Sequence, residues 1–88
     1  MRTIHKFPLE LVDHAQRHYH ISSTDTIVLV DAQRGIPTVW AEVDSDDLAD
    51  KPAAFRVIGT GHEIPEGYEH VGSVQSPPFV WHVYREIQ

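Results

Sequence analysis

The stretch FRVIGTGHEIPEG, residues 55–67, decides what kind of fold this chain adopts. Its first half is an apolar run with strand-like alternation, and its second half is a corner with two glycines, a histidine and a proline. Glycine and proline interrupt regular structure, so we expect the strand that starts near Ala53 to end at Gly59. The chain repeats this arrangement of a short alternating run followed by turn residues, which is typical of a β protein.

Alternation of apolar and polar residues predicts the other strands. Pro8 cannot donate a hydrogen bond to a neighbouring strand, so the first strand should lie at a sheet edge. The run TIVLVDA should be buried on both faces, and the run FVWHVYREI, bulky on both faces, should be central or lie at an interface. Gly72 indicates a bulge or a close contact within its strand. These other predicted strands cover residues 3–11, 16–21, 26–32, 38–44, 69–75 and 79–87.

Six to seven short strands separated by turns predict a mainly β fold, a small antiparallel sandwich or barrel with at most one short helix. The alternative is an α+β fold with one helix, at residues 44–50 or 12–19. The chain has 88 residues, which suffice for a single domain covering residues 1–88. A core this small buries limited surface, so we expect a homo-oligomer, most simply a dimer.

The composition argues against several classes of function. Seven Lys and Arg stand against thirteen Asp and Glu, and the resulting net charge of −6 opposes the binding of nucleic acid. Because cysteine is absent, disulfides and thiolate metal sites are excluded. No apolar run approaches the ~20 residues that span a bilayer, and the first residues do not predict a signal peptide. We therefore expect a soluble intracellular protein without a membrane partner.

Several segments, taken in order, resemble a family of small phage and prophage proteins of unknown activity. These segments are TIHKFPLEL, IPTVWAEVD, FRVIGTGHEIPEG and VGSVQSPPFVWHVYRE, and they span nearly the whole chain. The resemblance implies a compact, mostly β fold and a phage or prophage origin, hence a place of action in the host cytoplasm. It implies no catalytic residue and no cofactor. Small phage proteins of this kind often act by binding host machinery.

The corner Gly59-Thr60-Gly61-His62 has two interpretations. Successive backbone N–H groups of a glycine-rich loop can bind an anion, and Arg56 or His62 can add positive charge. The third glycine of a dinucleotide-binding motif and the lysine of a phosphate-binding loop are both missing. A turn in which Gly59 or Gly61 has a positive φ explains both glycines without a ligand, and it is the preferred interpretation.

Seven histidines are many for a chain of this length. His18 and His20 would lie on one face of a strand, a spacing compatible with zinc, but no third ligand is specified. Surface or interface histidines are therefore the preferred interpretation of this pair. His82 lies within an apolar strand, so it should be at least half buried and should have a hydrogen-bond partner.

Large aromatic side chains offer a surface for a partner protein. Trp40, Trp81 and Tyr84 are the candidates for such an interface, because tryptophan and tyrosine dominate binding energy where proteins meet. For the two tryptophans, packing in the core is the preferred interpretation.

Three functions follow from these observations. The leading hypothesis is a non-enzymatic phage accessory protein that binds a host protein or complex, for example as an inhibitor of host defence. The second is a protein that sequesters a small nucleotide-like anion at the corner, with Arg56, Thr60 and His62 contributing. The third is a metal-assisted hydrolase that uses the histidines. Neither of the first two needs a cofactor, and the chain is expected to lack an enzymatic activity.

Overall fold

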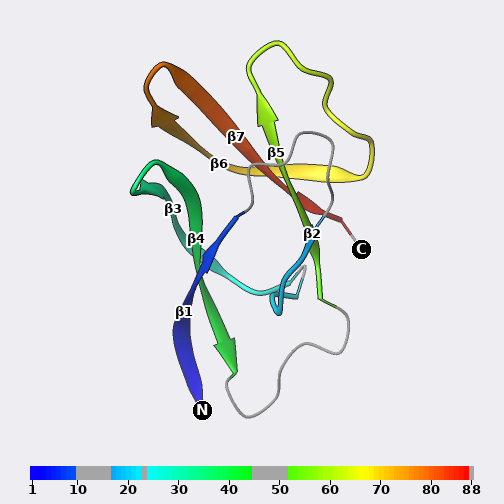
Figure 1. Cartoon of the computed structure of the whole chain (residues 1–88). Helices are drawn as coiled ribbons and strands as arrows, with labels where there is room; N and C mark the ends of the chain where they lie inside the picture. Colours follow the sequence, from blue (N-terminus) through cyan, green and yellow to red (C-terminus); the bar gives the residue numbers. More distant parts are fainter. Residues whose placement is uncertain (10–16, 23, 45–51, 88) are drawn as a thin grey trace.

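The computed structural model describes residues 1–9, 17–22, 24–44 and 52–87 (Figure 1). Within these ranges the chain forms seven strands and no helix, and no described segment is a helix able to cross a membrane. The two segments considered for a helix lie mostly outside the described residues. The strands are β1 (Arg2–Pro8), β2 (Arg17–His18), β3 (Ile27–Gln33), β4 (Ile36–Asp44), β5 (Ala54–Gly59), β6 (Tyr68–Ser76) and β7 (Phe79–Glu86).

All strand pairs are antiparallel, and they form two sheets. The first sheet has the strand order β1-β4-β3, and the second has the order β2-β5-β7-β6. The predicted small antiparallel β fold is therefore confirmed. The positions predicted for two strands are confirmed as well, because β1 lies at an edge and β7 is central in its sheet (Figure 1).

The core lies between the two sheets, on the strand faces that alternation selects. In β4, Val39, Ala41 and Val43 are buried, whereas Trp40 and Glu42 between them are partly exposed. Successive side chains of a strand point to opposite faces, so one face of β4 supplies the core and the other faces outward. The other buried members of the core cluster are Leu9, Ile21, Ala53, Phe55, Val57 and Val83.

β3 and β6, the edge strands of different sheets, approach each other closely at one glycine. A Cβ added to Gly72 would lie 2.6 Å from the Cβ of Val30, so only glycine fits at this position. The pairing of β6 with β7 also shifts register between His70 and Gly72. The bulge and the close contact predicted for this glycine are therefore both present.

A row of three aromatic rings connects the two sheets on the opposite side. Phe7 of β1 meets Tyr19 edge-to-face with ring centroids 6.4 Å apart, and Tyr19 meets Phe55 of β5 in the same way at 5.8 Å. Edge-to-face contacts of this kind are favourable beyond the area that the rings bury. The sandwich is thus closed along both sides.

The prediction that residues 26–32 are buried on both faces is wrong. β3 lies at the edge of the first sheet, and Val28 and Leu29 remain 45% and 47% exposed. Its pairing with β4 shifts register between Ile27 and Leu29. A continuous apolar run is buried on both faces only in a strand that is covered on both sides, which an edge strand with a shifted register is not.

The predicted strand 16–21 is shorter than expected. Only Arg17 and His18 pair with β5 as strand β2. Beyond them the chain stays beside Ala53 without forming a ladder: the Tyr19 N–H donates to the Ala53 carbonyl at 3.2 Å, and the Ala53 N–H donates to the Ile21 carbonyl at 2.7 Å.

Candidate functional site

The corner after β5 is a hydrogen-bonded turn. The His62 N–H donates to the Gly59 carbonyl at 3.1 Å, which closes a four-residue turn. Gly61, the third residue of the turn, has φ = 91°, a value that a turn of this kind assigns to glycine. The positive φ predicted for Gly59 or Gly61 therefore falls on Gly61. Because the His62 amide is used by the turn, the corner does not present it to an anion.

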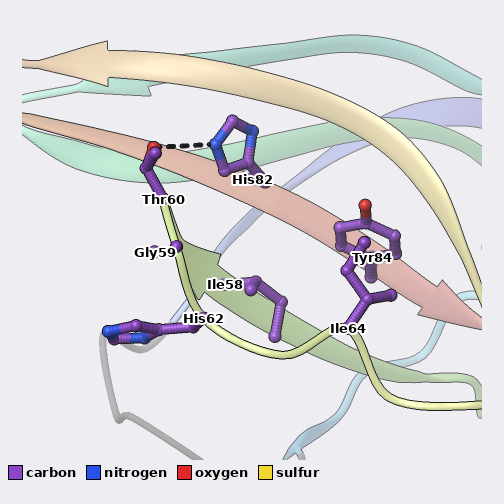
Figure 2. A pocket seen from close by; sticks show the side chains of 8 residues that line it. Ile58, Gly59, Thr60, His62, Ile64, His82 and Tyr84 are labelled. Carbon is purple, nitrogen blue, oxygen red and sulfur yellow. Dashed lines mark hydrogen bonds between the residues drawn. The ribbon is translucent and has the colours of Figure 1, made fainter.

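The imidazole of His62 lies on the core side of β5. A Cβ added to Gly59 would lie 3.4 Å from the His62 ring and 3.4 Å from the Trp81 ring, so Gly59 leaves room for both rings. Figure 2 shows His62 pointing away from Ile58 and Tyr84. His62 therefore contributes backbone rather than its ring to the surface on the other side of the corner.

An open pocket of about 270 Å³ lies on that other side, between the loop that follows β5 and the outer face of the second sheet. Ile58 and Tyr84 come from the sheet, and Ile64 comes from the loop (Figure 2). Thr60 and His82 lie at one end of the pocket (Figure 2). Its complete lining is Ile58, Gly59, Thr60, Gly61, His62, Ile64, His82 and Tyr84.

Four polar side chains form a hydrogen-bonded series that starts at this pocket, and we call it the imidazole–hydroxyl chain. The Thr60 Oγ1 lies 3.0 Å from the His82 Nε2, and the His82 Nδ1 lies 2.8 Å from the Ser73 Oγ. The Ser73 Oγ lies 2.9 Å from the Nε2 of His70. Both ring nitrogens of His82 thus have partners, so the partner predicted for this partly buried histidine is present.

Strand pairing explains why these side chains meet. β7 lies between β5 and β6, and His82 is opposite Ile58 on one side and Ser73 on the other. His70 and Ser73 are three residues apart, and in a regular strand such residues point to opposite faces. The register shift between His70 and Gly72 inserts an extra residue, which brings both side chains to the outer face.

Aromatic side chains continue the same outer face beyond the pocket. The Tyr84 ring meets the His70 ring with centroids 5.4 Å apart. The guanidinium carbon of Arg56 lies 6.0 Å from the centroid of the Tyr68 ring. Burial raises the pKa of the Tyr68 phenol, the nearby Glu86 carboxylate raises it further, and Arg56 opposes them. The positive charge of Arg56 therefore lies beside the pocket and does not line it.

The three aromatic residues predicted as an interface do not share one surface. Trp40 alternates with the buried Val39 and Ala41, so it lies on the outer face of the first sheet. Trp81 packs against the core and stacks on Phe79 with centroids 5.2 Å apart. Tyr84 belongs to the pocket on the outer face of the second sheet. Core packing, the interpretation preferred for both tryptophans, thus holds for Trp81 and is wrong for Trp40, whose position in the strand alternation turns it outward.

The histidine pair proposed for zinc does not form a recognisable ligand set. His18 ends β2, and His20 lies in the exposed bend that follows it, so the two do not continue one strand face. Within the part of the chain that the structure describes, no three His, Asp or Glu side chains are grouped as metal ligands.

The sequence points to residues 59–62, His82 and Tyr84 of the pocket lining but not to Ile58 or Ile64. It also does not point to Ser73 and His70, which belong to the imidazole–hydroxyl chain and lie outside the lining. Alternation places Ile58 and His82 on the outer faces of their strands, so their proximity follows once β5 and β7 are known to pair. His70 belongs to the imidazole–hydroxyl chain only because of the bulge in β6, and the sequence does not specify the register of that bulge.

Comparisons with known proteins assign the chain to a family and identify no individual relative. A search of curated proteins and a search of solved structures give no significant match. A family model described as a domain of unknown function, DUF7352, matches residues 1–88. The match covers the entire length over which the two sheets and the corner pocket are built. The chain belongs to the DUF7352 family.

Proposed function

We propose that this domain is a binding protein that holds a small ring-shaped ligand, of the nucleobase type, in the pocket at residues 58–64. The observation that carries the proposal is the lining of the pocket. Ile58, Ile64 and Tyr84 provide apolar and aromatic contacts, and Thr60 and His82 provide hydrogen-bonding groups at one end. Small-molecule sites typically combine a mainly apolar lining with a few such polar groups.

The size of the pocket limits the ligand. Its volume of about 270 Å³ is just below the roughly 300–1,000 Å³ typical of pockets for drug-sized molecules. A single heteroaromatic ring system therefore fits, with one face against Ile58 and Tyr84 and its polar edge toward Thr60. Such an edge would form hydrogen bonds that an apolar ligand of the same size would lack.

The distribution of charge favours recognition of the ring over recognition of a phosphate. The His62 amide is used within the turn, and Arg56 does not line the pocket. Arg56 precedes Ile58 by two residues on the same strand face, a separation of about 7 Å. The phosphate of a nucleotide whose base occupies the pocket would extend toward Arg56. We therefore expect the anionic part of a nucleotide-like ligand to lie outside the pocket.

Titration of ¹⁵N-labelled protein with adenosine and with AMP tests this function. We expect both to shift the backbone amides of residues 58–64, with the larger affinity for AMP because of Arg56. Thr60→Val should weaken binding about fivefold to tenfold, the effect of one lost hydrogen bond. Thr26→Val, at an exposed threonine remote from the pocket, is the matched control. The proposal would be contradicted if the amides did not respond at millimolar nucleoside. It would also be contradicted if Thr60→Val and Thr26→Val lost the same amount of affinity.

Binding of a host protein is the second candidate function. It is favoured by the Tyr68, Tyr84 and Arg56 side chains that gather on the outer face of the second sheet, because tyrosine and arginine are enriched where proteins bind one another. The resemblance to phage and prophage proteins supports a partner in the cytoplasm of the host cell. Tyr84→Ala should then abolish recovery of one specific host protein with the tagged domain, while Ile4→Ser on the first sheet should leave it unchanged.

A further inference from the structure

The imidazole–hydroxyl chain has a direction, because each member passes one hydrogen to the next. A neutral imidazole carries one N–H donor and one acceptor nitrogen, and a hydroxyl donates one hydrogen and accepts others. With separations of 3.0, 2.8 and 2.9 Å along the series, every link is a hydrogen bond. The two links of His82 therefore reverse together, and Ser73 can donate to only one of its two histidine neighbours at a time.

Two arrangements satisfy all three links and also use the Ser73 hydrogen within the series. In the first, His70 donates from Nε2 to Ser73, Ser73 donates to the Nδ1 of His82, and His82 donates from Nε2 to Thr60. The hydroxyl hydrogen of Thr60 is then directed into the pocket. In the second, Thr60 donates to the Nε2 of His82, His82 donates from Nδ1 to Ser73, and Ser73 donates to His70. Thr60 then offers only lone pairs to the pocket.

We propose that His70, which does not line the pocket, determines whether Thr60 donates or accepts a hydrogen bond toward the ligand. His70 is the exposed end of the series, so the hydrogen on its Nε2 sets the tautomer of His82 through Ser73. This role makes His70 a specificity-determining residue that acts through two others. The part of the proposal that concerns the ligand rests on the proposed function, whereas the part that concerns the His82 tautomer does not.

Two substitutions at His70 fix the direction in opposite senses. His70→Glu places a carboxylate, which only accepts, beside Ser73 and enforces the second arrangement. His70→Lys places an ammonium group, which only donates, so the Ser73 hydrogen is left for the Nδ1 of His82 and the first arrangement is favoured. Nitrogen NMR at a pH well above the usual pKa of imidazole distinguishes the tautomers. We expect the Nδ1–H form of His82 in His70→Glu and the Nε2–H form in His70→Lys.

The control is the same pair of substitutions in a Ser73→Ala background. Removing the Ser73 hydroxyl interrupts the series, so the two His70 variants should then give the same His82 tautomer. A tautomer that responds equally with and without Ser73 would show a direct effect of charge and would overturn the proposal. A tautomer that responds in neither background would overturn it too.

The ligand arm compares adenosine with inosine, which differ by an amino group against a carbonyl group at one position of the ring. His70→Glu should favour adenosine, whose amino group donates, and His70→Lys should favour inosine, whose carbonyl accepts. We expect the ratio of the two affinities to differ about tenfold between the variants. An unchanged ratio with intact nucleoside binding would overturn this role of His70. Absence of binding by the wild-type protein would overturn the proposed function and leave the tautomer result as the decisive test of His70.

Discussion

Gly72 and Gly61 are both needed as glycine, for different physical reasons. A Cβ at Gly72 would overlap Val30, whereas nothing lies within 4 Å of a Cβ at Gly61, whose φ of 91° is the only obstacle. We predict that Gly72→Ala destabilises the fold by about 1–3 kcal/mol through overpacking. Gly61→Ala should cost roughly 1 kcal/mol through backbone strain. Urea unfolding of both variants measures these costs.

A second substitution separates the two causes. Val30→Ala creates space opposite Gly72, so it should recover part of the stability lost in Gly72→Ala and none of that lost in Gly61→Ala. Strictly additive effects of Gly72→Ala and Val30→Ala would contradict the assignment of a direct contact.

Tyr68 should make the stability of the fold depend on pH in the alkaline range. Its pKa is raised mainly by burial, with Glu86 adding and Arg56 opposing. The unfolded chain therefore loses this proton first, near the usual tyrosine pKa of about 10, and the folded protein loses it at higher pH. The free energy of unfolding should fall as the pH rises through this window. In Tyr68→Phe the fall should be smaller, and parallel curves for the two proteins would count against the burial of Tyr68.

At the scale of single residues, the sequence predicts a property correctly when that property depends on the residue's own segment alone. That His82 would need a partner follows from a histidine in an apolar run, and the positive φ in the corner follows from its two glycines. The partners themselves could not be predicted. Ser73 faces His82 only through the pairing of β6 with β7, and His70 joins it only through a bulge.

Among the structural elements, Arg85 of β7 bonds to the turn that precedes β3. The Arg85 Nη1 donates to the Asp25 carbonyl at 2.8 Å, and its Nη2 lies 3.2 Å from Glu69. The Arg85 side chain is only 11% exposed, so its bond to the Asp25 carbonyl is partly shielded from water, whereas Glu69 is 47% exposed. We predict that Arg85→Met costs about 2–3 kcal/mol of stability, the range for a hydrogen bond to a charged group together with a buried carbonyl left unpaired.

The exposed pair of Arg2 and Glu42 provides the control for Arg85. Arg2 is 67% exposed at a similar separation from its carboxylate, 3.2 Å, and Arg2→Met should change stability by less than about 0.5 kcal/mol. Hydrogen exchange should show faster opening of residues 24–26 in Arg85→Met alone. Equal losses of stability in the two variants would contradict an attachment through Arg85.

The elements themselves were largely predictable, because alternation reveals the core face of β4 and of β5. The exception is β3. Its apolar run has the composition of a central strand, yet the strand lies at an edge and exposes Val28 and Leu29. Burial of an apolar run depends on which strands pair beside it, and strand order is a property of the whole chain.

For the whole molecule, the outer faces of the two sheets differ in character. The second sheet presents the pocket and the imidazole–hydroxyl chain. The first presents Trp40 between β1 and β3, with exposed Ile4 and Leu29 nearby. β7 is central in its sheet, but Phe79 and Val80 at its start remain 55% and 38% exposed. If the domain self-associates, the first sheet offers the more apolar face.

We predict a two-fold dimer in which the outer faces of two copies of the first sheet meet. Lys6 lies on β1 opposite Trp40, and Asp31 lies on β3 on the other side of β4; both are exposed. Two sheets packed face to face with nearly aligned strands, related by a two-fold axis along β4, place β1 of each copy over β3 of the other. The dimer then contains two equivalent contacts, each between Lys6 of one copy and Asp31 of the other.

Sedimentation equilibrium of charge-reversal variants tests this arrangement without disturbing the core. The wild-type protein should have twice the 10.0 kDa mass of one chain. Lys6→Asp and Asp31→Lys should each weaken the dimer, because each opposes like charges across the interface, and the double variant should restore it. Ile64→Ser, at an exposed apolar residue of the other face, should have no effect. A wild-type protein that is still monomeric at about 100 μM would exclude the dimer, because stable dimers have dissociation constants below this concentration. A double variant no tighter than the single ones would exclude this face, because only a direct approach of Lys6 to Asp31 makes the two reversals compensate.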